Sequence, residues 1–409
     1  MSAEEFDLII AGGGLVGGAL ALALAPLGKR IALVEARAPE VPIEDVYNER
    51  SVALGLSSRL ILEGIGLWSR LADAAEPMTQ VHVSQRGRFG ATRLHAADEG
   101  LPALGYVIVN RLLLQAMLDA IADAPNIVTI APARVVAVQP LPDAVAVSLS
   151  GDTAPKALNA ALLIAADGAH SPTRQALGIA AEQIDYEQSA VVANVHAESS
   201  PRGSAFERFT DEGPMALLPL GPQRYALVWT QTPTQAEALL ALDERAFLAA
   251  LQARFGYRAG TFTQAGRREA YPLSRVRAAR LVGERALLIG NAAHTVHPVA
   301  GQGLNLALRD VATLASLLRD APDPGDPTVL HRYAGQRQPD IDRTVAMTDG
   351  LLRVFANPWL PVSLARTAGL FMLDFLPAFK RRIARIGMGL AYPTEARLAR
   401  GTAWERRLE

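Results

Sequence analysis

The sequence predicts an α/β protein in which strand-rich insertions interrupt a parallel sheet and a helical C-terminus follows it. Three observations support this fold. An apolar strand, a glycine-rich turn and an Ala/Leu-rich helix open the chain, and a similar succession recurs near residue 290. The segment 81–94 alternates apolar and polar residues as a hairpin does, and short apolar segments within 190–230 suggest a larger sheet. The length of 409 residues accommodates about two or three domains.

The composition narrows the classes of function. The 40 basic residues are balanced by 41 acidic ones, which argues against nucleic-acid binding through a strongly basic surface. Cysteine is absent, so disulfides and thiolate metal sites are excluded and a reducing, cytoplasmic compartment is expected. Two uncharged stretches, 8–28 and 286–308, contain glycines or buried-type polar residues, and neither is expected to span a membrane.

The first glycine cluster has the spacing of a Rossmann-like dinucleotide site. A strand is expected over 7–11 and a helix over about 18–27, with Gly12, Gly14 and Gly17 between them. In this pattern the first glycine permits a tight turn, the second lets the backbone approach a pyrophosphate, and the third lets the helix pack closely on the strand. Free N–H groups at the helix N-terminus would then face the phosphates.

Glu35 completes this pattern. It ends a second expected strand, 30–35, and follows Gly12 by 23 residues, where a carboxylate can accept hydrogen bonds from ribose hydroxyls. An acid at this place favours an adenosine ribose without a 2′-phosphate, as in FAD or NAD rather than NADP. A glycine turn that serves packing alone is the alternative.

A second loop could hold the other end of a dinucleotide. An apolar strand over 286–289 leads to Gly290 and Asn291, and a loop punctuated by glycines then leads into a helix expected over 304–318. The backbone of such a loop can approach a flat ligand closely, and the helix supplies a second N-terminus. Together the two sites could bind both ends of a long dinucleotide.

These motifs, with Asp167 and Gly168 between them in the chain, resemble those of the aromatic-ring hydroxylases, the single-component FAD monooxygenases. The ordered matches extend over about three hundred residues. The resemblance implies a Rossmann-like FAD-binding domain with an inserted β-sheet substrate domain. It also implies FAD as the cofactor, NAD(P)H as a transient co-substrate and O₂ as the source of the inserted oxygen.

The same resemblance implies which residues bind FAD. It places Gly290 and Asn291 at the flavin-side ribose, the loop 298–305 along the isoalloxazine ring, and the Asp167–Gly168 pair near the pyrophosphate and the nicotinamide channel. It further implies two arginine contacts and a backbone contact with adenine. The complete set is Gly12, Gly14, Gly17, Glu35, Arg50, Arg111, Val135, Asp167, Gly168, Gly290, Asn291, Pro298, Gly301, Gly303, Leu304 and Asn305.

Two members of this set have structural alternatives. Asp167 could cap a turn or a helix, since Asp-Gly is a common turn pair. Arg111 could be a surface residue of the helix expected over 110–122.

One departure from the family pattern narrows the resemblance. Asn291 stands where the family has an acid, so a hydrogen bond to ribose is retained but a charge is lost. This variation and the segments 205–210, 213–219, 271–273 and 355–359 are similar to the ubiquinone-biosynthesis branch. The branch implies a polyprenylated phenol, 2-polyprenyl-6-methoxyphenol, as substrate and a ubiquinone-biosynthesis protein assembly as partner. Hydroxylation of another position on the ring stays open.

The sequence does not identify a catalytic residue. Glu207, Arg208 and Tyr225 could reach a substrate cavity, but nothing separates them from ordinary sheet residues. His294 and His297 lack a completing set of ligands, so no metal site is expected. The cofactor is expected to carry the chemistry, helped by partial phenolate character of the substrate and exclusion of water.

Two functions of other classes stay open beside hydroxylation. One is a flavoprotein that reduces an isoprenoid without consuming O₂. The other is a non-catalytic flavoprotein that holds together a quinone-biosynthesis assembly.

The predicted domains are discontinuous in the chain. The FAD-binding domain comprises 1–75, 105–180 and 278–345. The β-rich substrate domain comprises 76–104 and 181–277, and the C-terminal helical region is 346–409.

The C-terminal region contains a basic amphipathic stretch, 380–388. Peripheral contact with anionic lipid, on the inner face of a membrane, is one interpretation of such a stretch. Packing on its own domain, or on another subunit of a homo-oligomer, is the alternative that we favour.

Overall fold

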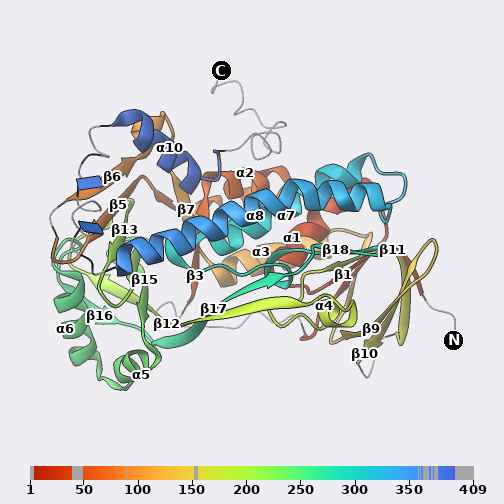
Figure 1. The fold of residues 1–409 in the computed structure, drawn as a ribbon, viewed down its shortest axis with the longest axis horizontal. Coiled ribbons are helices and arrows are strands. Elements are labelled where there is room, and N and C mark those ends of the chain that lie inside the picture. Colours follow the sequence, from red (N-terminus) through yellow and green to blue (C-terminus); the bar gives the residue numbers. More distant parts are fainter. Residues whose placement is uncertain are drawn as a thin grey trace.

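The computed structural model describes residues 4–38, 49–88, 90–151, 155–357, 359, 361–362, 368–369, 372 and 376–391. Its described strands form two large sheets toward opposite ends of an elongated molecule, and a third, three-stranded sheet (Figure 1). The long helix α8 (Pro327–Ala356) runs lengthwise across the molecule (Figure 1).

The first sheet is mainly parallel and deeply buried. Its strands lie in the order β18–β19–β11–β1–β2–β8, and β10 and β9 continue from β11 as an antiparallel extension. Every residue of β2 is buried, as expected for a parallel strand covered on both faces. The strands are β1 (Glu4–Ala11), β2 (Ile31–Val34), β8 (Ile127–Ile130), β9 (Arg134–Pro140), β10 (Val145–Ser150), β11 (Ala157–Ala165), β18 (Val282–Gly283) and β19 (Ala286–Leu288).

Several helices pack into the core that this sheet shares with α8, and three of them bury much of one side there. These three are α1 (Leu15–Leu24), α3 (Asn110–Ala122) and α7 (Gln302–Arg319). Helix α1 begins before the expected residue, Gly18, because Gly14 already takes the extended N-cap conformation. It gives way to a 3₁₀ turn at Ala25, since Pro26 has no N–H with which to continue the helix.

The second sheet has the order β16–β12–β15–β14–β13–β5–β6, with β17 paired to β12. Helices α5 (Pro233–Ala241) and α6 (Glu244–Phe255) cover one face, where Trp229, Phe247 and Phe255 are buried together. Its strands are β5 (Gln80–Gln85), β6 (Ala91–His95), β12 (Ala181–Ala197), β13 (Ser204–Phe209), β14 (Pro214–Pro219), β15 (Arg224–Gln231), β16 (Phe262–Ala265) and β17 (Glu269–Ala278).

The third sheet joins β3 (Ser51–Gly55), β7 (Gly105–Val109) and β4 (Glu76–Met78). Helix α2 (Leu56–Gly64) follows β3, and α10 (Pro377–Gly387) packs beside it, because Leu56, Leu60 and Ala384 share one hydrophobic cluster. Within the described residues, no helix combines the length and the apolar character that crossing a membrane requires.

The predicted fold class is confirmed: a Rossmann-like α/β sheet carries an inserted β-sheet, and a helical region follows. The alternating segment 81–94 forms the antiparallel hairpin β5–β6. The division of the chain into domains stays a prediction.

Candidate functional site

The first glycine turn, residues 12–17, contains two glycines that the fold itself requires. A Cβ atom on Gly12 would lie 2.5 Å from the Ala166 carbonyl oxygen, and one on Gly17 would lie 1.8 Å from the Gly12 carbonyl oxygen. Gly14 differs, because beyond its own chain neighbours no described atom lies within 4 Å of the place where its Cβ would be. The structure therefore leaves open space in front of Gly14.

The N-terminus of α1 opens onto this space. No side chain caps the helix, and its first turn contains no acidic residue. Its unpaired N–H groups and the positive end of the helix dipole therefore remain available to an anion. This arrangement fits the pyrophosphate of FAD.

Glu35 follows β2 and faces the same turn. Its Oε2 accepts a hydrogen bond of 2.7 Å from the N–H of Gly13. Its carbonyl oxygen accepts the N–H of Ala133 at 2.7 Å, which brings the start of β9, including the buried Val135, beside it. Glu35 and Val135, two residues expected at the adenosine end of FAD, come from different parts of the chain and lie close together in the structure.

The second glycine loop, residues 290–301, is anchored by a buried carboxylate. Oδ2 of Asp310, on α7, lies 2.9 Å from the N–H of Gly290 and 2.7 Å from Nε2 of His294. Oδ1 accepts a 2.6 Å hydrogen bond from Nε of Arg337, on α8. Burial opposes ionisation, but the charges of His294 and Arg337 and these hydrogen bonds outweigh it and hold the pKa of Asp310 well below its usual range.

Asn305 anchors the start of α7 from the other side. Its Oδ1 accepts the N–H of Gly55 at 2.7 Å and the hydroxyl of Ser58 at 2.6 Å. Its Nδ2 donates to the carbonyl oxygens of Ala53 at 2.9 Å and Gly301 at 2.6 Å. The side chain expected to contact FAD therefore has its hydrogen-bonding capacity satisfied by the protein, although Asn305 lines the cavity described next.

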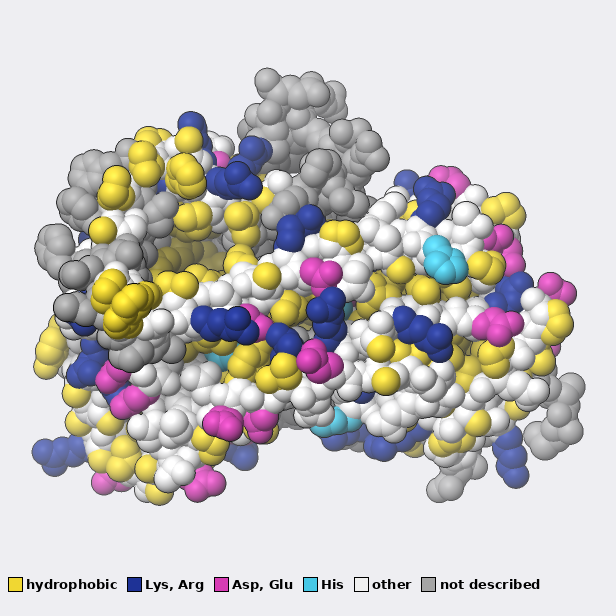
Figure 2. All heavy atoms as spheres, viewed as in Figure 1, with side chains coloured by type: hydrophobic (Ala, Val, Ile, Leu, Met, Phe, Trp, Pro, Cys, Tyr) yellow, Lys and Arg dark blue, Asp and Glu magenta, His cyan; other side chains and the backbone are white. Residues whose placement is uncertain are grey.

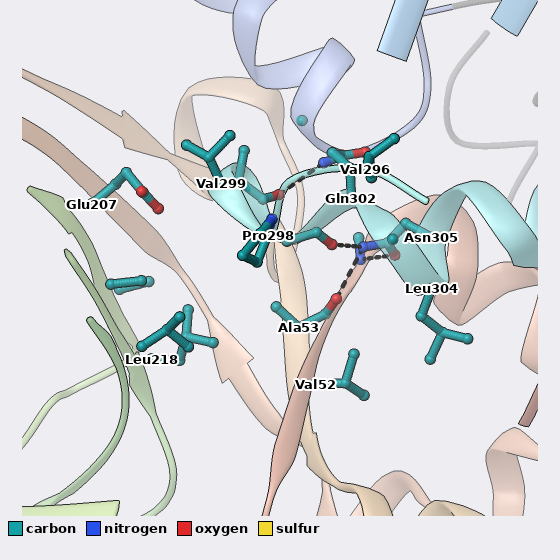
Figure 3. A pocket seen from close by; sticks show the side chains of 18 of the residues that line it. Val52, Ala53, Glu207, Leu218, Val296, Pro298, Val299, Gln302, Leu304 and Asn305 are labelled. Atoms are coloured by element: carbon teal, nitrogen blue, oxygen red, sulfur yellow. Dashed lines mark hydrogen bonds between the residues drawn. The ribbon is translucent and has the colours of Figure 1, made fainter. Parts of the chain in front are cut away.

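A cavity of about 980 Å³ separates this loop from the second sheet. One wall consists of Pro298, Gly301, Gly303 and Leu304 with neighbouring backbone (Figure 3). No side chain caps the N-terminus of α7, and no atom lies within 4 Å of a Cβ placed on Gly303. This wall fits a flat ring system that contacts backbone.

The opposite wall is apolar, and Leu218 of β14 lies on it (Figure 3). Gly14, Gly168 and Asn291 also line the cavity, which joins the two glycine motifs in one space. Residues of α8 and α10 close the rim; they are Met347, Leu351, Phe355, Ile383, Ala384 and Ile386.

Asp167 caps the start of a helix, which is the structural alternative considered for it from the sequence. Its Oδ2 accepts the N–H of Thr173 at 3.0 Å, and Oδ1 accepts the hydroxyl of Ser171. These bonds hold the start of the short helix α4 (Pro172–Ala176). Gly168, with φ +89°, is the member of the pair that reaches the cavity.

The two arginines expected to contact FAD do not line the large cavity. Arg50 lies 2.6 Å from Glu269 and stacks on the ring of Tyr271, at the edge of a smaller cavity of about 160 Å³. Arg111 pairs with Glu49 at 2.5 Å and is not a free surface residue. Their contacts with FAD stay a prediction.

Of the three candidates for catalysis, the structure brings only Glu207 to the large cavity among the residues that it describes. Tyr225 is buried on the opposite face, against α6, and Arg208 lies over the ring of Phe255. Desolvation raises the pKa of the Glu207 carboxyl to about 8, against the opposing effect of a hydrogen bond from the backbone of Ala300. The alternation of β13 places residues 205, 207 and 209 on one face of the strand. It does not show whether that face meets the cavity.

Comparison with known proteins agrees with this geometry. Residues 5–348 match the FAD binding domain family. Ubiquinone hydroxylase UbiL of Rhodospirillum rubrum is 40% identical over 403 residues, which cover 97% of this chain and 92% of that protein. The 3-demethoxyubiquinol 3-hydroxylase of Escherichia coli is 33% identical over 402 residues, which cover 95% of this chain and 100% of that protein.

A solved structure is similar in fold. The p-nitrophenol 4-monooxygenase PnpA from Pseudomonas putida DLL-E4 has a TM-score of 0.78 at 20% identity, and the match covers 95% of this chain and 99% of that one. Two glycine motifs on one cavity, a family match over most of the chain and full-length relatives point the same way. The chain belongs to the FAD-dependent hydroxylases of ubiquinone biosynthesis, within the class A aromatic monooxygenases.

Proposed function

We propose that the protein hydroxylates the aromatic ring of a polyprenylated phenol, 2-polyprenyl-6-methoxyphenol, with NAD(P)H as electron donor. The observation that carries this proposal is the shared cavity: one wall is backbone of the second glycine loop, and the other is the apolar face of the second sheet. A space of about 980 Å³ lined mainly by apolar groups suits a prenylated ring held against a flavin.

FAD, when bound, supplies the redox chemistry that activates O₂. The residues that would hold it divide between the two motifs. We propose Gly14 and the N-terminus of α1 for the pyrophosphate, supported by the open space in front of Gly14, and Glu35 for the adenosine ribose. For the remaining contacts we propose Gly12, Gly17, Arg50, Arg111, Val135, Asp167, Gly168, Gly290, Asn291, Pro298, Gly301, Gly303, Leu304 and Asn305.

NAD(P)H is proposed to bind transiently. The second glycine loop lacks the third glycine of a Rossmann fingerprint, so the chain has one fingerprint and FAD would occupy it. The apolar wall around the reacting ring would exclude water, which protects a reactive oxidant.

We also propose peripheral contact with anionic lipid through α10. One side of this helix packs on α2 through Ala384, whereas Phe379 and Ile383 on another side are 62% and 39% exposed. Arg381 and Arg382 are exposed beside them. Because Ile383 also lines the cavity, the cavity reaches the surface at this helix, and Figure 2 shows hydrophobic side chains around a hollow there. A prenyl tail could pass from lipid into the site along this route.

Turnover of the purified, FAD-loaded protein tests the proposal. A short-chain 2-prenyl-6-methoxyphenol should stimulate NAD(P)H oxidation and yield a product that carries one atom from ¹⁸O₂. If a demethoxyubiquinol analogue is hydroxylated instead, the reaction type of the proposal stands, but the hydroxylated ring position is a different one. Saturation of the prenyl chain without O₂ would identify an isoprenoid reductase, and bound FAD without turnover of any of these compounds would favour the non-catalytic role.

A deletion strain of the host provides a second test. Mass spectrometry of its quinone lipids should show accumulated polyprenyl-methoxyphenol. Accumulation of a polyprenylphenol or a demethoxyquinone would reassign the ring position. If ubiquinone is unchanged and no precursor accumulates, complementation of a known hydroxylase mutant would separate redundancy from a wrong pathway.

A further inference from the structure

Glu207 is the exception on an otherwise apolar wall. It lies on β13 between Val83 of β5 and Ala216 of β14, which are its register partners on the two sides. Among the described residues that line the large cavity, it is the only one with an ionisable side chain. An acidic residue in such a place needs either a partner or a function, because burying an unpaired charge is costly.

Among the described residues, the backbone of Ala300 in the second glycine loop is the hydrogen-bonding partner found for the Glu207 carboxyl. Ala300 has φ +60°, a left-handed conformation that is uncommon for residues other than glycine and that belongs to the wall opposite β13. Figure 3 shows the carboxylate across from Pro298 and Val299. The Glu207 carboxyl therefore extends from the apolar wall toward the backbone that is proposed to meet the flavin.

Among the residues that the structure describes, no other charged side chain lines the cavity around this carboxylate. The neighbouring residues on β5 and β14 are apolar, and α8 and α10 contribute Met347, Leu351 and Ile383. The second glycine loop has one nearby imidazole, His297, whose Nδ1 accepts the N–H of Val299 and whose ring packs on the edge of Tyr186. His297 is buried and is not part of the cavity wall.

We propose that Glu207 is the catalytic base that accepts the proton of the substrate hydroxyl, and that it thereby orients the phenol ring toward the second glycine loop. This proposal rests on the proposed function. The phenol O–H bond breaks, its electron pair stays on oxygen as a phenolate, and the proton passes to the carboxylate. After oxygen insertion the carboxyl returns the proton to the product oxygen, so the residue is unchanged over one cycle.

The electronic consequence favours hydroxylation. A phenolate donates more electron density into the ring than a phenol, and an electrophilic oxidant therefore attacks it faster. The raised pKa of Glu207, about 8, makes its carboxylate a better base for a phenol and places its titration near the pH of the cell.

The test compares Glu207→Gln, Glu207→Asp and a control, Glu198→Gln, in which an exposed glutamate next to β12 is changed. Glutamine keeps the size and an acceptor for the Ala300 N–H but cannot take a proton. We expect kcat of Glu207→Gln to fall by about 100-fold or more, with a smaller change in KM, and Glu207→Asp to recover part of it. The control should behave as wild type.

Two further readouts separate a base from a merely structural residue. In the wild type kcat should rise with pH and level off above about pH 8, and this limb should be absent in Glu207→Gln. A fluorinated phenol, which ionises more easily, should reduce the loss in Glu207→Gln. Equal kcat and equal pH profiles in wild type and Glu207→Gln would overturn the proposal while the function stands, whereas a wild type that hydroxylates no phenol would overturn the function itself.

Discussion

The backbone N–H of Gly290 donates a 2.9 Å hydrogen bond to Oδ2 of Asp310, a residue twenty positions further along the chain. The same carboxylate bonds Arg337 of α8, which also pairs with Asp340 at 2.6 Å. The position of the second glycine loop therefore depends on a buried ionic cluster in which Asp310 and Arg337, from outside the loop, bond Gly290 and His294 of the loop or each other. Burial makes this cluster costly to disturb.

Asp310→Asn should destabilise the protein by about 3–5 kcal/mol, because it leaves the buried Arg337 with one carboxylate instead of two. The folded-state pKa of Asp310 lies below its unfolded value, so its contribution to stability is complete above about pH 4 and declines as pH falls toward the folded pKa. The free energy of unfolding should rise with pH in this acid range in the wild type and rise less in the variant, as measured by urea denaturation.

The control for this experiment is Glu237→Gln, which changes an exposed carboxylate on α5. It should leave both the stability and the acid slope unchanged. If Asp310→Asn showed the wild-type slope, the pKa of Asp310 would not differ between the folded and the unfolded protein.

Gly14 and Gly17 should respond differently to alanine. Gly17→Ala places a methyl group against the Gly12 carbonyl oxygen and should cost about 3 kcal/mol or more, because the helix must shift. Gly14→Ala enters open space and should cost less than about 1 kcal/mol, yet weaken FAD binding by about tenfold or more, equivalent to about 1.4 kcal/mol.

Thermal unfolding of the FAD-free proteins and fluorescence titration with FAD measure the two effects separately. Normal FAD affinity in Gly14→Ala would place the pyrophosphate elsewhere than in front of this glycine. A stable Gly17→Ala protein would mean that α1 can move away from the first glycine turn at little cost.

The parts of the site that local spacing encodes were predictable. Gly12, Gly17 and Glu35 follow from the strand–turn–helix pattern, whose geometry depends on neighbours in sequence. The roles of Asp310 and Arg337 were not, because they arise only when α7 and α8 pack together.

The resemblance singled out the second glycine loop, which lines the cavity, but it could not show how each side chain is used. Asn305 lines the cavity, yet its side-chain amide forms hydrogen bonds with β3 and α2. This arrangement depends on the position of a strand 250 residues earlier in the chain. Likewise, the alternation of β13 groups Glu207 with Ala205, but whether their face meets α6 or the cavity is decided by tertiary packing.

Asn305 and Asn291 should therefore differ in what they stabilise. Asn305→Ala leaves the buried Gly55 N–H without its acceptor and should cost about 1–3 kcal/mol for each group left unpaired. Asn291 is exposed to the cavity, so Asn291→Ala should keep the stability of the FAD-free protein and weaken FAD binding. Urea denaturation and FAD titration check both variants.

Asn291→Asp is the matched variant, since it restores the acid that the family has at this position. It should retain FAD binding through the ribose hydroxyl. If Asn291→Ala binds FAD as tightly as wild type, the side chain does not contact the ribose.

The exposed side of α10 should bind anionic vesicles. Arg381 and Arg382 are exposed beside the apolar Phe379, and basic residues at an anionic surface contribute about 1 kcal/mol each. Arg381→Gln combined with Arg382→Gln should therefore weaken sedimentation with phosphatidylglycerol vesicles by about 30-fold. Added salt should weaken the wild-type interaction as well, because the attraction is screened.

A control pair, Arg245→Gln with Arg319→Gln, removes two exposed arginines from α6 and α7 and should bind like wild type. Equal loss in both pairs would show a nonspecific charge effect. A different outcome is that neither the wild type nor any variant sediments with vesicles, while the Arg381→Gln and Arg382→Gln substitutions dissociate a dimer. This side of α10 would then be a contact between subunits. The substrate would reach the cavity from a carrier protein rather than from the bilayer.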